Sequence, residues 1–312
     1  RPPAPFMAAG NKPVTLPSAT LHRSLSVLLE VLREELSLKN RTQVERVIYD
    51  PRTDEAVIVR LHSPEIPDNV PLLILDATGD QDLLEEIVGP VEFRTIDIEQ
   101  RAFTTQVYDR TGSNSFWNGD TAPVADLVSI LNVWARLGEH PLLISHKKLA
   151  DQLRERSDLD ESVMVNHFQN VRGSNAAEHA SAVFITGRNS PPAWTIDIKA
   201  RAVFWAADQP LCHDEASFLP ATGTALPRLP TVLRGYLQSG ANPHPQSGVE
   251  VRSFTDERIE ALHRQSREAE TIQAIARLRL VHAPFVKNVI LLGNLPVEMP
   301  VDQFVRFDEL MP

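Results

Sequence analysis

Four short groups of polar residues are candidates for chemistry, and three of them directly follow an apolar stretch. They are centred on Asp76, Lys147, Arg172 and Arg277. Carboxylate and hydroxyl groups can relay hydrogen bonds between two bound ligands, whereas lysine and arginine side chains bind anions. A parallel sheet carries its ligands at the carboxyl ends of its strands, so the first three groups stand where such a sheet would use them.

The first group is Asp76, Ala77 and Thr78, directly after the apolar run 70–75. Its carboxylate and hydroxyl could pass hydrogen bonds between a bound phosphate and a second ligand. The same residues, with Asp80, also suit the N-cap of a helix over 81–88. Both interpretations remain open from the sequence.

The second group, Ser145, His146, Lys147 and Lys148, follows a buried strand. Two lysines at a helix N-terminus oppose the helix dipole, which favours acidic residues there. This placement favours an anionic ligand such as a sugar-phosphate backbone. A solvated basic patch is the alternative.

The third group occupies residues 166–175 and includes Asn170, Arg172, Gly173, Ser174 and Asn175. Glycine permits a positive φ or close backbone approach. Serine and asparagine can cap the next helix and offer N–H groups to a phosphate. A plain turn does not require an arginine and so many amides, so this pattern favours a binding role.

The fourth group lies late on a long predicted helix. Gln273 and Arg277 are four residues apart and share one helical face, while Arg279 lies further round. An arginine supplied by a second body to a nucleotide γ-phosphate is an arginine finger. A cationic helix C-terminus, favourable through the dipole, explains the same residues equally well.

The other candidates are weaker. Cys212, His213 and Asp214 suggest a metal or hydrolytic site, although consecutive residues of one loop rarely share such a geometry. No histidine pair has metal-ligand spacing, and no Gly-x-Ser-x-Gly string occurs. We therefore predict no metal site.

The hydrophobic spacing around these groups predicts an alternation of strands and helices. Strands are expected at 44–49, 55–61, 70–75, 93–98, 141–145, 163–168, 182–187 and 286–292, and helices at 20–38, 81–88, 122–137, 146–156, 196–205 and 255–279. The first two strands form a hairpin in this interpretation. The later order predicts an α/β fold with a mostly parallel sheet.

Composition excludes several classes of protein. The 312 residues carry a formal net charge of −10, so any nucleic-acid contact needs a local groove rather than bulk positive charge. No apolar run approaches the roughly 20 residues that a membrane span needs. The single cysteine excludes an internal disulfide framework and a multi-cysteine zinc site, and it favours a reducing, cytoplasmic setting.

The chain carries no glycine-rich phosphate loop of its own. Neither Gly-x-x-x-x-Gly-Lys-Ser/Thr nor Gly-x-Gly-x-x-Gly occurs. The chain also begins with Arg1 rather than methionine, so we expect it to be a piece of something longer.

The order of the four groups resembles the succession of motifs in superfamily 2 helicases. The Leu-Asp-Ala-Thr string ending at Thr78 is similar to motif III, and the strand before Lys147 stands in the place of motif IV. The Arg-Gly-Ser-Asn string beginning at Arg172 stands in the place of motif V, and residues 273–279 resemble motif VI. The likeness is greatest to plasmid- and phage-type DNA primase/helicase proteins, and it covers roughly residues 70–295.

The resemblance implies a RecA-like, mostly parallel sheet with helices on both faces, preceded by a helix plus β-hairpin insert. It divides the chain into a Pro-rich tail (1–18), the insert (19–66), the end of a first RecA-like lobe (67–100) and a second lobe (101–312) with a Pro-rich insertion at about 190–248. The missing Walker loop and its acidic pair would lie in an upstream first lobe.

The function implied is that of the C-terminal portion of an ATP-dependent helicase or translocase, in the replication of a mobile element. Its ligands would be single-stranded or duplex nucleic acid, with DNA expected, and ATP with Mg²⁺ shared with the first lobe. The nucleotide-contacting residues would be Arg277, Arg279 and Gln273, and the nucleic-acid contacts would be Thr78, His146, Lys147, Asn170, Arg172, Gly173, Ser174 and Asn175, with Asp76 coupling the two.

One departure and one alternative accompany this resemblance. The superfamily's motif VI reads Gln-x-x-Gly-Arg-x-Gly-Arg, whereas here Ala276 replaces the glycine and the second arginine comes one residue early. The resemblance therefore assigns the nucleotide contact to Arg277 first. The alternative is a non-catalytic α/β module that binds nucleic acid or protein through Arg172 and its neighbours. In either case this chain alone is not expected to hydrolyse ATP.

Overall fold

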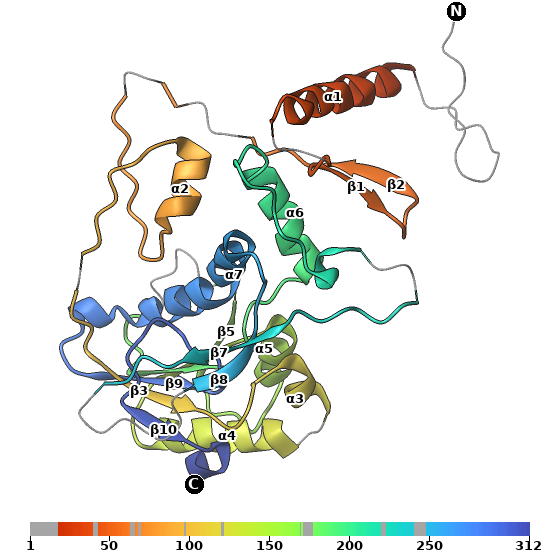
Figure 1. The fold of residues 1–312 in the computed structure, drawn as a ribbon. Helices are drawn as coiled ribbons and strands as arrows, with labels where there is room; N and C mark the ends of the chain where they lie inside the picture. The colour runs from red at the N-terminus through yellow and green to blue at the C-terminus, as the bar shows by residue number, and fades with distance from the viewer. Residues whose placement is uncertain are drawn as a thin grey trace, which may run out of the picture.

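The centre of the molecule is a six-stranded sheet in a computed structural model of the chain (Figure 1). The structure describes residues 18–39, 43–62, 66–67, 70–96, 98–119, 122–168, 170, 177–219, 223–239 and 248–312. The strand order is β10-β3-β9-β6-β4-β5, and every neighbouring pair runs parallel. The strands are β3 (Ala102–Val107), β4 (Pro141–Ser145), β5 (Met164–His167), β6 (Ala182–Ile185), β9 (Lys287–Leu291) and β10 (Gln303–Val305). The predicted α/β fold with a RecA-like, mostly parallel sheet is confirmed.

Helices cover both faces of this sheet because its inner strands are apolar on both sides. In β4, Leu143 packs into one buried cluster, whereas Leu142 and Ile144 pack into another on the opposite face. Alternate strand residues point to opposite faces, which explains the continuous apolar runs in the sequence. The first cluster contains α4 (Ala122–Arg136) and α5 (Lys147–Arg154), with α3 (Asn114–Gly119) and the 3-10 helix η4 (Phe307–Leu310); the second contains the end of α7 (Glu257–Ile275), with the 3-10 turns η2 (Ala276–Leu278) and η3 (Leu280–His282).

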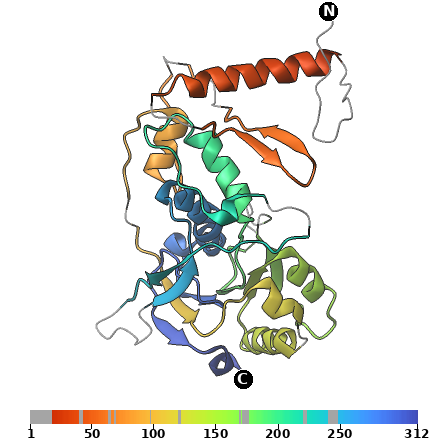
Figure 2. The same cartoon turned by 45° about the vertical axis from the view of Figure 1, so that its right-hand side comes forward.

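A third apolar cluster lies away from the sheet and joins α2, α6 and the first half of α7. Leu83, Ile196 and Ile259 are buried in it. Beyond α6 lie helix α1 and the antiparallel hairpin β1–β2, so the predicted insert ahead of the sheet is present (Figures 1 and 2). These elements are α1 (Ser18–Leu36), β1 (Val47–Asp50), β2 (Glu55–Ile58), α2 (Gln81–Val88) and α6 (Ala193–Val203).

Two predicted strands are not formed. The runs at 70–75 and 93–98 pair with no strand in the part of the chain that the structure describes. Their apolar side chains are exposed, with Leu75 at 85% and Ile96 at 77%. The apolar run predicted burial on both faces, but such burial needs neighbouring strands, and no strand of the described residues lies beside these segments. Both predictions are wrong.

The hydrophobic pattern also missed several elements. The inner strand β3 went unnoticed because it carries Thr104 and Gln106, two polar residues that are fully buried in the structure. The Pro-rich stretch contains more order than expected, since α6 begins at Ala193 and a second hairpin follows. The remaining missed elements are η1 (Glu215–Ser217), β7 (Thr231–Gly235) and β8 (Gly248–Arg252), together with α3, β10 and η4.

Candidate functional site

A cleft separates helix α7 from the segment 74–100, in which α2 is flanked by stretches without regular secondary structure. It consists of two adjoining cavities of about 450 and 740 Å³. Both are lined by Ala77 and Ile98 from the segment and by Ile272 from α7. Cavities of this size can admit a nucleotide-sized ligand, so the cleft is the first place to look for the predicted site residues.

Thr78 connects the two sides of this cleft. The Oδ1 atom of Asp76 accepts hydrogen bonds from the backbone N–H and the hydroxyl of Thr78, at 2.8 and 3.1 Å. From α7, Gln273 Nε2 donates to Thr78 Oγ1 at 2.9 Å, and Gln265 Nε2 donates to the Thr78 carbonyl at 2.7 Å. The N-cap of α2 is Asp80, whose carboxylate accepts from Leu83 N. Asp76 and Thr78 therefore do not serve as the helix cap, and three predicted site residues meet in one hydrogen-bonded chain.

The two predicted arginines after α7 have different surroundings. The α-helix ends at Ile275 rather than continuing to Arg279, and Arg279 adopts the left-handed conformation with φ 52° and ψ 49°. That turn, which is costly for a residue with a Cβ, brings Arg279 to the wall of the smaller cavity. Arg279 Nε lies 3.6 Å from a carboxylate oxygen of Glu178. Arg277 lines neither cavity, and its buried Nε has no hydrogen-bond partner among the described residues.

His146 and Lys147 lie at the carboxyl edge of the sheet, where β4 passes into α5. Lys147 is the first residue of α5 and is exposed. The His146 ring packs against Gly187, where an added Cβ would lie 2.2 Å from His146 Nε2, so only glycine fits there. Burial, and then the nearby charge of Arg188, lowers the pKa of His146, so its ring is neutral at pH 7.

The third predicted group falls mostly outside the described residues. Asn170 is described, and its Nδ2 donates to Asn166 Oδ1 at 2.9 Å beyond the end of β5. Arg172, Gly173, Ser174 and Asn175 are not described.

Arg188 is a candidate that the sequence analysis missed. It follows β6 and lines a third, small cavity at the carboxyl edge of the sheet. The available signal was a Gly-Arg pair just past a buried strand, but the prediction ended its strand at Gly187 and did not consider Arg188. The charge of Arg188 acts on His146, so Arg188 lies near the second predicted group, residues 145–148.

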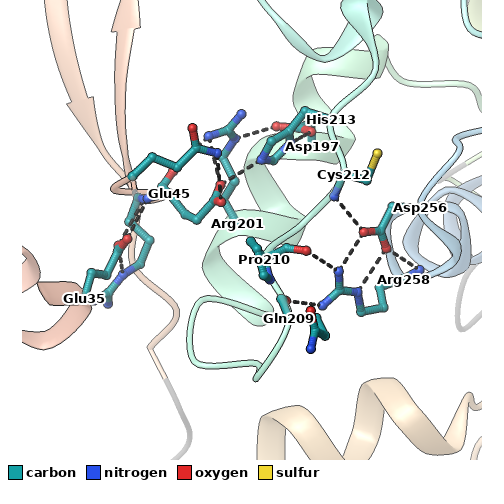
Figure 3. Close-up of polar contacts among 12 residues, drawn as sticks. Glu35, Glu45, Asp197, Arg201, Gln209, Pro210, Cys212, His213, Asp256 and Arg258 are labelled. Carbon is teal, nitrogen blue, oxygen red and sulfur yellow. Dashed lines mark hydrogen bonds and ion pairs between the residues drawn. The ribbon is translucent and has the colours of Figure 1, made fainter. Parts of the chain in front are cut away.

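The loop containing Cys212 and His213 forms a saturated salt-bridge cluster (Figure 3). His213 Nδ1 lies 2.7 Å from Asp197 Oδ2, and His213 Nε2 lies 2.7 Å from Glu45 Oε2. Arg201 contacts the same two carboxylates, at 2.5 and 3.3 Å.

The chemistry of this cluster does not fit the metal or hydrolytic hypothesis. Burial disfavours a charged imidazole, but the hydrogen bonds to Asp197 and Glu45 outweigh it and raise the pKa of His213 to about 9. An imidazolium with both nitrogens donating has no lone pair left for a metal or a proton. In the described ranges no group of three His, Cys, Asp or Glu residues could hold a metal ion.

Comparison with protein-family models, with curated proteins and with solved structures finds no match to this chain. In the part of the chain that the structure covers, no helix has both the length and the apolar character that a membrane crossing requires. The functional interpretation therefore depends on the site itself.

Proposed function

We propose that the chain is the C-terminal portion of an ATP-dependent nucleic-acid helicase or translocase, acting on DNA in the cytoplasm during replication of a mobile element. The observation that carries this proposal is the hydrogen bond between Gln273 and Thr78, residues 195 positions apart. It joins two of the motif-like strings across a cleft beside a RecA-like sheet. A helix amide that holds a loop hydroxyl can couple ligand contacts on the two sides of the cleft.

The residues of this chain fit one side of an ATP site. The buried Nε of Arg277 has no partner within the described residues, and Arg279 makes a long, half-exposed ion pair with Glu178. Arg279 lines the smaller cavity, whereas Arg277 would have to reach the phosphate oxygens when the first lobe closes the cleft. There the two arginines would place positive charge against developing negative charge. The sequence contains no phosphate-binding loop of its own. Mg-ATP, when bound, would supply the phosphoryl-transfer chemistry, and a first lobe would hold most of it.

Exposed apolar segments support a first RecA-like lobe as the partner. Leu72 and Leu73 are neighbours in sequence, so they point to opposite sides of an extended chain, yet they are 54% and 79% exposed. Segment 93–98 is exposed in the same way. Strands of this type are stable when a parallel sheet buries both of their faces. In this proposal the first lobe supplies that sheet and closes the cleft.

The decisive test is Arg277→Ala in a protein that includes the first lobe. We expect ATP hydrolysis to be abolished while single-strand binding persists, because the arginine acts on the nucleotide. Steady-state ATPase assays and fluorescence anisotropy with a labelled single-stranded oligonucleotide measure the two effects. The matched control is Arg156→Ala, which removes an arginine whose surface partner is Asp158.

Three outcomes would contradict the proposal. Residues 1–312 alone should not turn over ATP, and turnover at a motor's rate would show that the lobe assignment is wrong. Equal loss of hydrolysis and binding in Arg277→Ala at an unchanged melting temperature would contradict the nucleotide contact, whereas a lowered melting temperature would indicate a folding defect. Binding to nucleic acid without any hydrolysis in the longer protein would favour the non-catalytic module instead.

A further inference from the structure

A small cavity at the carboxyl edge of the sheet has the features of a binding site that the four motif groups do not include. It lies where β3, β6 and β9 end and where α7 passes the sheet. Its volume is about 20 Å³, which is room for a single water-sized group. The residues that line it are Thr111, Ile185, Gly187, Arg188, Thr271, Leu291, Gly293, Leu295 and Val297.

The walls of this cavity are preformed by close backbone contacts. An added Cβ at Gly293 would lie 2.9 Å from the Thr111 carbonyl oxygen, and one at Gly112 would lie 2.5 Å from the Leu292 carbonyl oxygen. Glycine is therefore required at both positions, and Gly112 also has a positive φ of 57°. The loops after β3 and β9 are held against each other without intervening side chains, so the cavity does not depend on flexible groups.

Arg188 supplies the charge of the site. In the described ranges its guanidinium makes no hydrogen bond or ion pair, although burial lowers its pKa and the charges of Arg267 and Arg252 lower it further. Glu268 is the nearby carboxylate that favours the charged form, but Glu268 already accepts from Arg267 at 2.7 Å and from Arg234. Arg188 is half-buried, and even partial withdrawal of an unpaired guanidinium from water is unfavourable. An anionic ligand would provide the missing partner.

A second polar group nearby also lacks a partner. Thr186, the residue before Gly187, has a buried hydroxyl with no hydrogen-bond partner in the described part of the chain. Thr186 does not line the cavity, but its hydroxyl would lie 3.3 Å from a Cβ added at Gly112, beside the cavity-lining Thr111. Nearly all buried hydroxyls are satisfied in native structures, so this one is a second unsatisfied polar group on the segment that carries Arg188.

We propose that Arg188 and the loops of this cavity bind one phosphate group of a nucleic-acid backbone, with a single phosphoryl oxygen entering the cavity. The volume excludes a base or a sugar but admits one oxygen. The guanidinium fork matches the geometry of a phosphate. The exposed Lys147, at the end of the neighbouring strand β4, offers a contact for a second phosphate along the same edge. This inference rests on the proposed function and names a contact that the motif resemblance does not include.

The test uses the full chain and a fluorescein-labelled oligothymidylate, with anisotropy measured over a series of salt concentrations. For Arg188→Met we expect about tenfold weaker binding, because a hydrogen-bonded charge contact is lost. The slope of log K against log salt should also fall by about 0.7, the value for one phosphate contact on a single strand. Arg156→Met removes the same charge from a surface pair, and its affinity and slope should stay within error of the wild type.

Stability distinguishes a ligand contact from a structural role. Because Arg188 has no partner in the described residues, Arg188→Met should leave the melting temperature unchanged or raise it. If Arg188 had a structural role instead, its replacement by methionine would lower the melting temperature. If Arg188→Met does lower the melting temperature, Arg188→Lys decides the matter: it should keep the salt slope but lose part of the affinity, because the second hydrogen bond of the fork is missing.

The outcomes separate this inference from the function on which it rests. Wild-type affinity and slope in Arg188→Met would overturn the phosphate site and leave nucleic-acid binding intact. A wild-type chain that binds no oligonucleotide would overturn the proposed function and this inference together. Binding of polyglutamate that Arg188→Met abolishes, with oligothymidylate binding unaffected, would also overturn it and would assign the cavity to an acidic protein segment.

Discussion

Two polar regions of this molecule differ in whether their charged groups have hydrogen-bond or ion-pair partners. In the cluster around His213 both ring nitrogens face carboxylates, and Arg201 completes the set. The Arg188 guanidinium, at the wall of a small cavity, has no partner among the described residues, and neither has the hydroxyl of Thr186, two residues earlier in the chain. Buried charges that are fully paired within the protein hold parts of a structure together. Charges without a protein partner are left to interact with a ligand or with solvent. The contrast separates a structural cluster from a candidate binding site.

The saturated cluster joins segments that are distant in the sequence. Glu35 of α1 accepts from the backbone N–H of Glu45 at 2.6 Å and from Arg46 Nε at 2.8 Å. The Arg46 guanidinium lies 3.9 Å above the Trp205 ring, just after α6. Together with the bond from Glu45 to His213, these contacts attach α1 and the first hairpin to α6 (Figure 3). The cluster therefore holds α1 and the β1–β2 hairpin against α6.

The largest expected effect comes from unbalancing this cluster with Asp197→Asn. The change leaves His213 and Arg201, two buried cations, to share the single carboxylate of Glu45. We expect the free energy of unfolding to fall by about 3–5 kcal/mol, the usual result of removing one partner from a buried ion pair. Urea denaturation at pH 7 measures it. Asp158→Asn, which breaks a surface pair, is the matched control and should leave the midpoint within error. Equal effects of the two changes would contradict the contrast drawn here.

The next effect is a loss of stability at alkaline pH. The pKa of His213 is raised from its ordinary value of 6.5 to about 9 in the folded state. Its contribution to stability is therefore complete below pH 6.5 and is lost as the pH rises through 9. The full size of this contribution is roughly 3 kcal/mol. Urea denaturation across that pH window should show the decline in the wild type and not in His213→Gln; parallel curves would mean that His213 is not the titrating group.

The smallest of the three effects is expected at the cleft, where two glutamine side chains of α7 bond to Thr78. Thr78→Val and Gln273→Ala each remove one end of the hydrogen bond between Thr78 and α7. A double-mutant cycle in urea should give a coupling free energy of about 1 kcal/mol. Gln265→Ala is the control, because Gln265 bonds the carbonyl of Thr78 rather than its hydroxyl and should be additive with Thr78→Val. Additivity of both pairs would show that the cleft is not held by this bond.

Much of the fold could be predicted because the signals are local. The apolar run at β4, the leucine repeat of α1 and the limits of α2 all follow from spacing within a few residues. The errors have a common cause, which is that burial depends on neighbours far along the chain. Segment 70–75 has the composition of a buried strand but has no neighbouring strand among the described residues. In contrast, β3 looks polar and is buried because it lies between β10 and β9, where Gln106 donates to the Gly293 carbonyl.

For the candidate site, too, local patterns could be read from the sequence and long-range partners could not. The strings around Thr78 and Gln273 were selected from residue type and spacing, and their contact agrees with that choice. Arg188 was missed because nothing in its sequence neighbourhood distinguishes an arginine that lacks a partner from one that has a salt bridge. At His213 the sequence analysis set the Cys-His-Asp triplet aside as a weak metal candidate, but it could not show that His213 pairs with Asp197 and Glu45.

The sequence by itself determined the alternation of strands and helices, the parallel α/β class and the positions of the polar groups, because periodicity and turn chemistry act over short distances. Only the tertiary structure decided which charges are matched. A side chain's partners come from other segments, as Glu45 comes to His213 and Gln273 comes to Thr78. Whether a buried cation holds the fold together or is left available for a ligand depends on that long-range pairing, which no local pattern records.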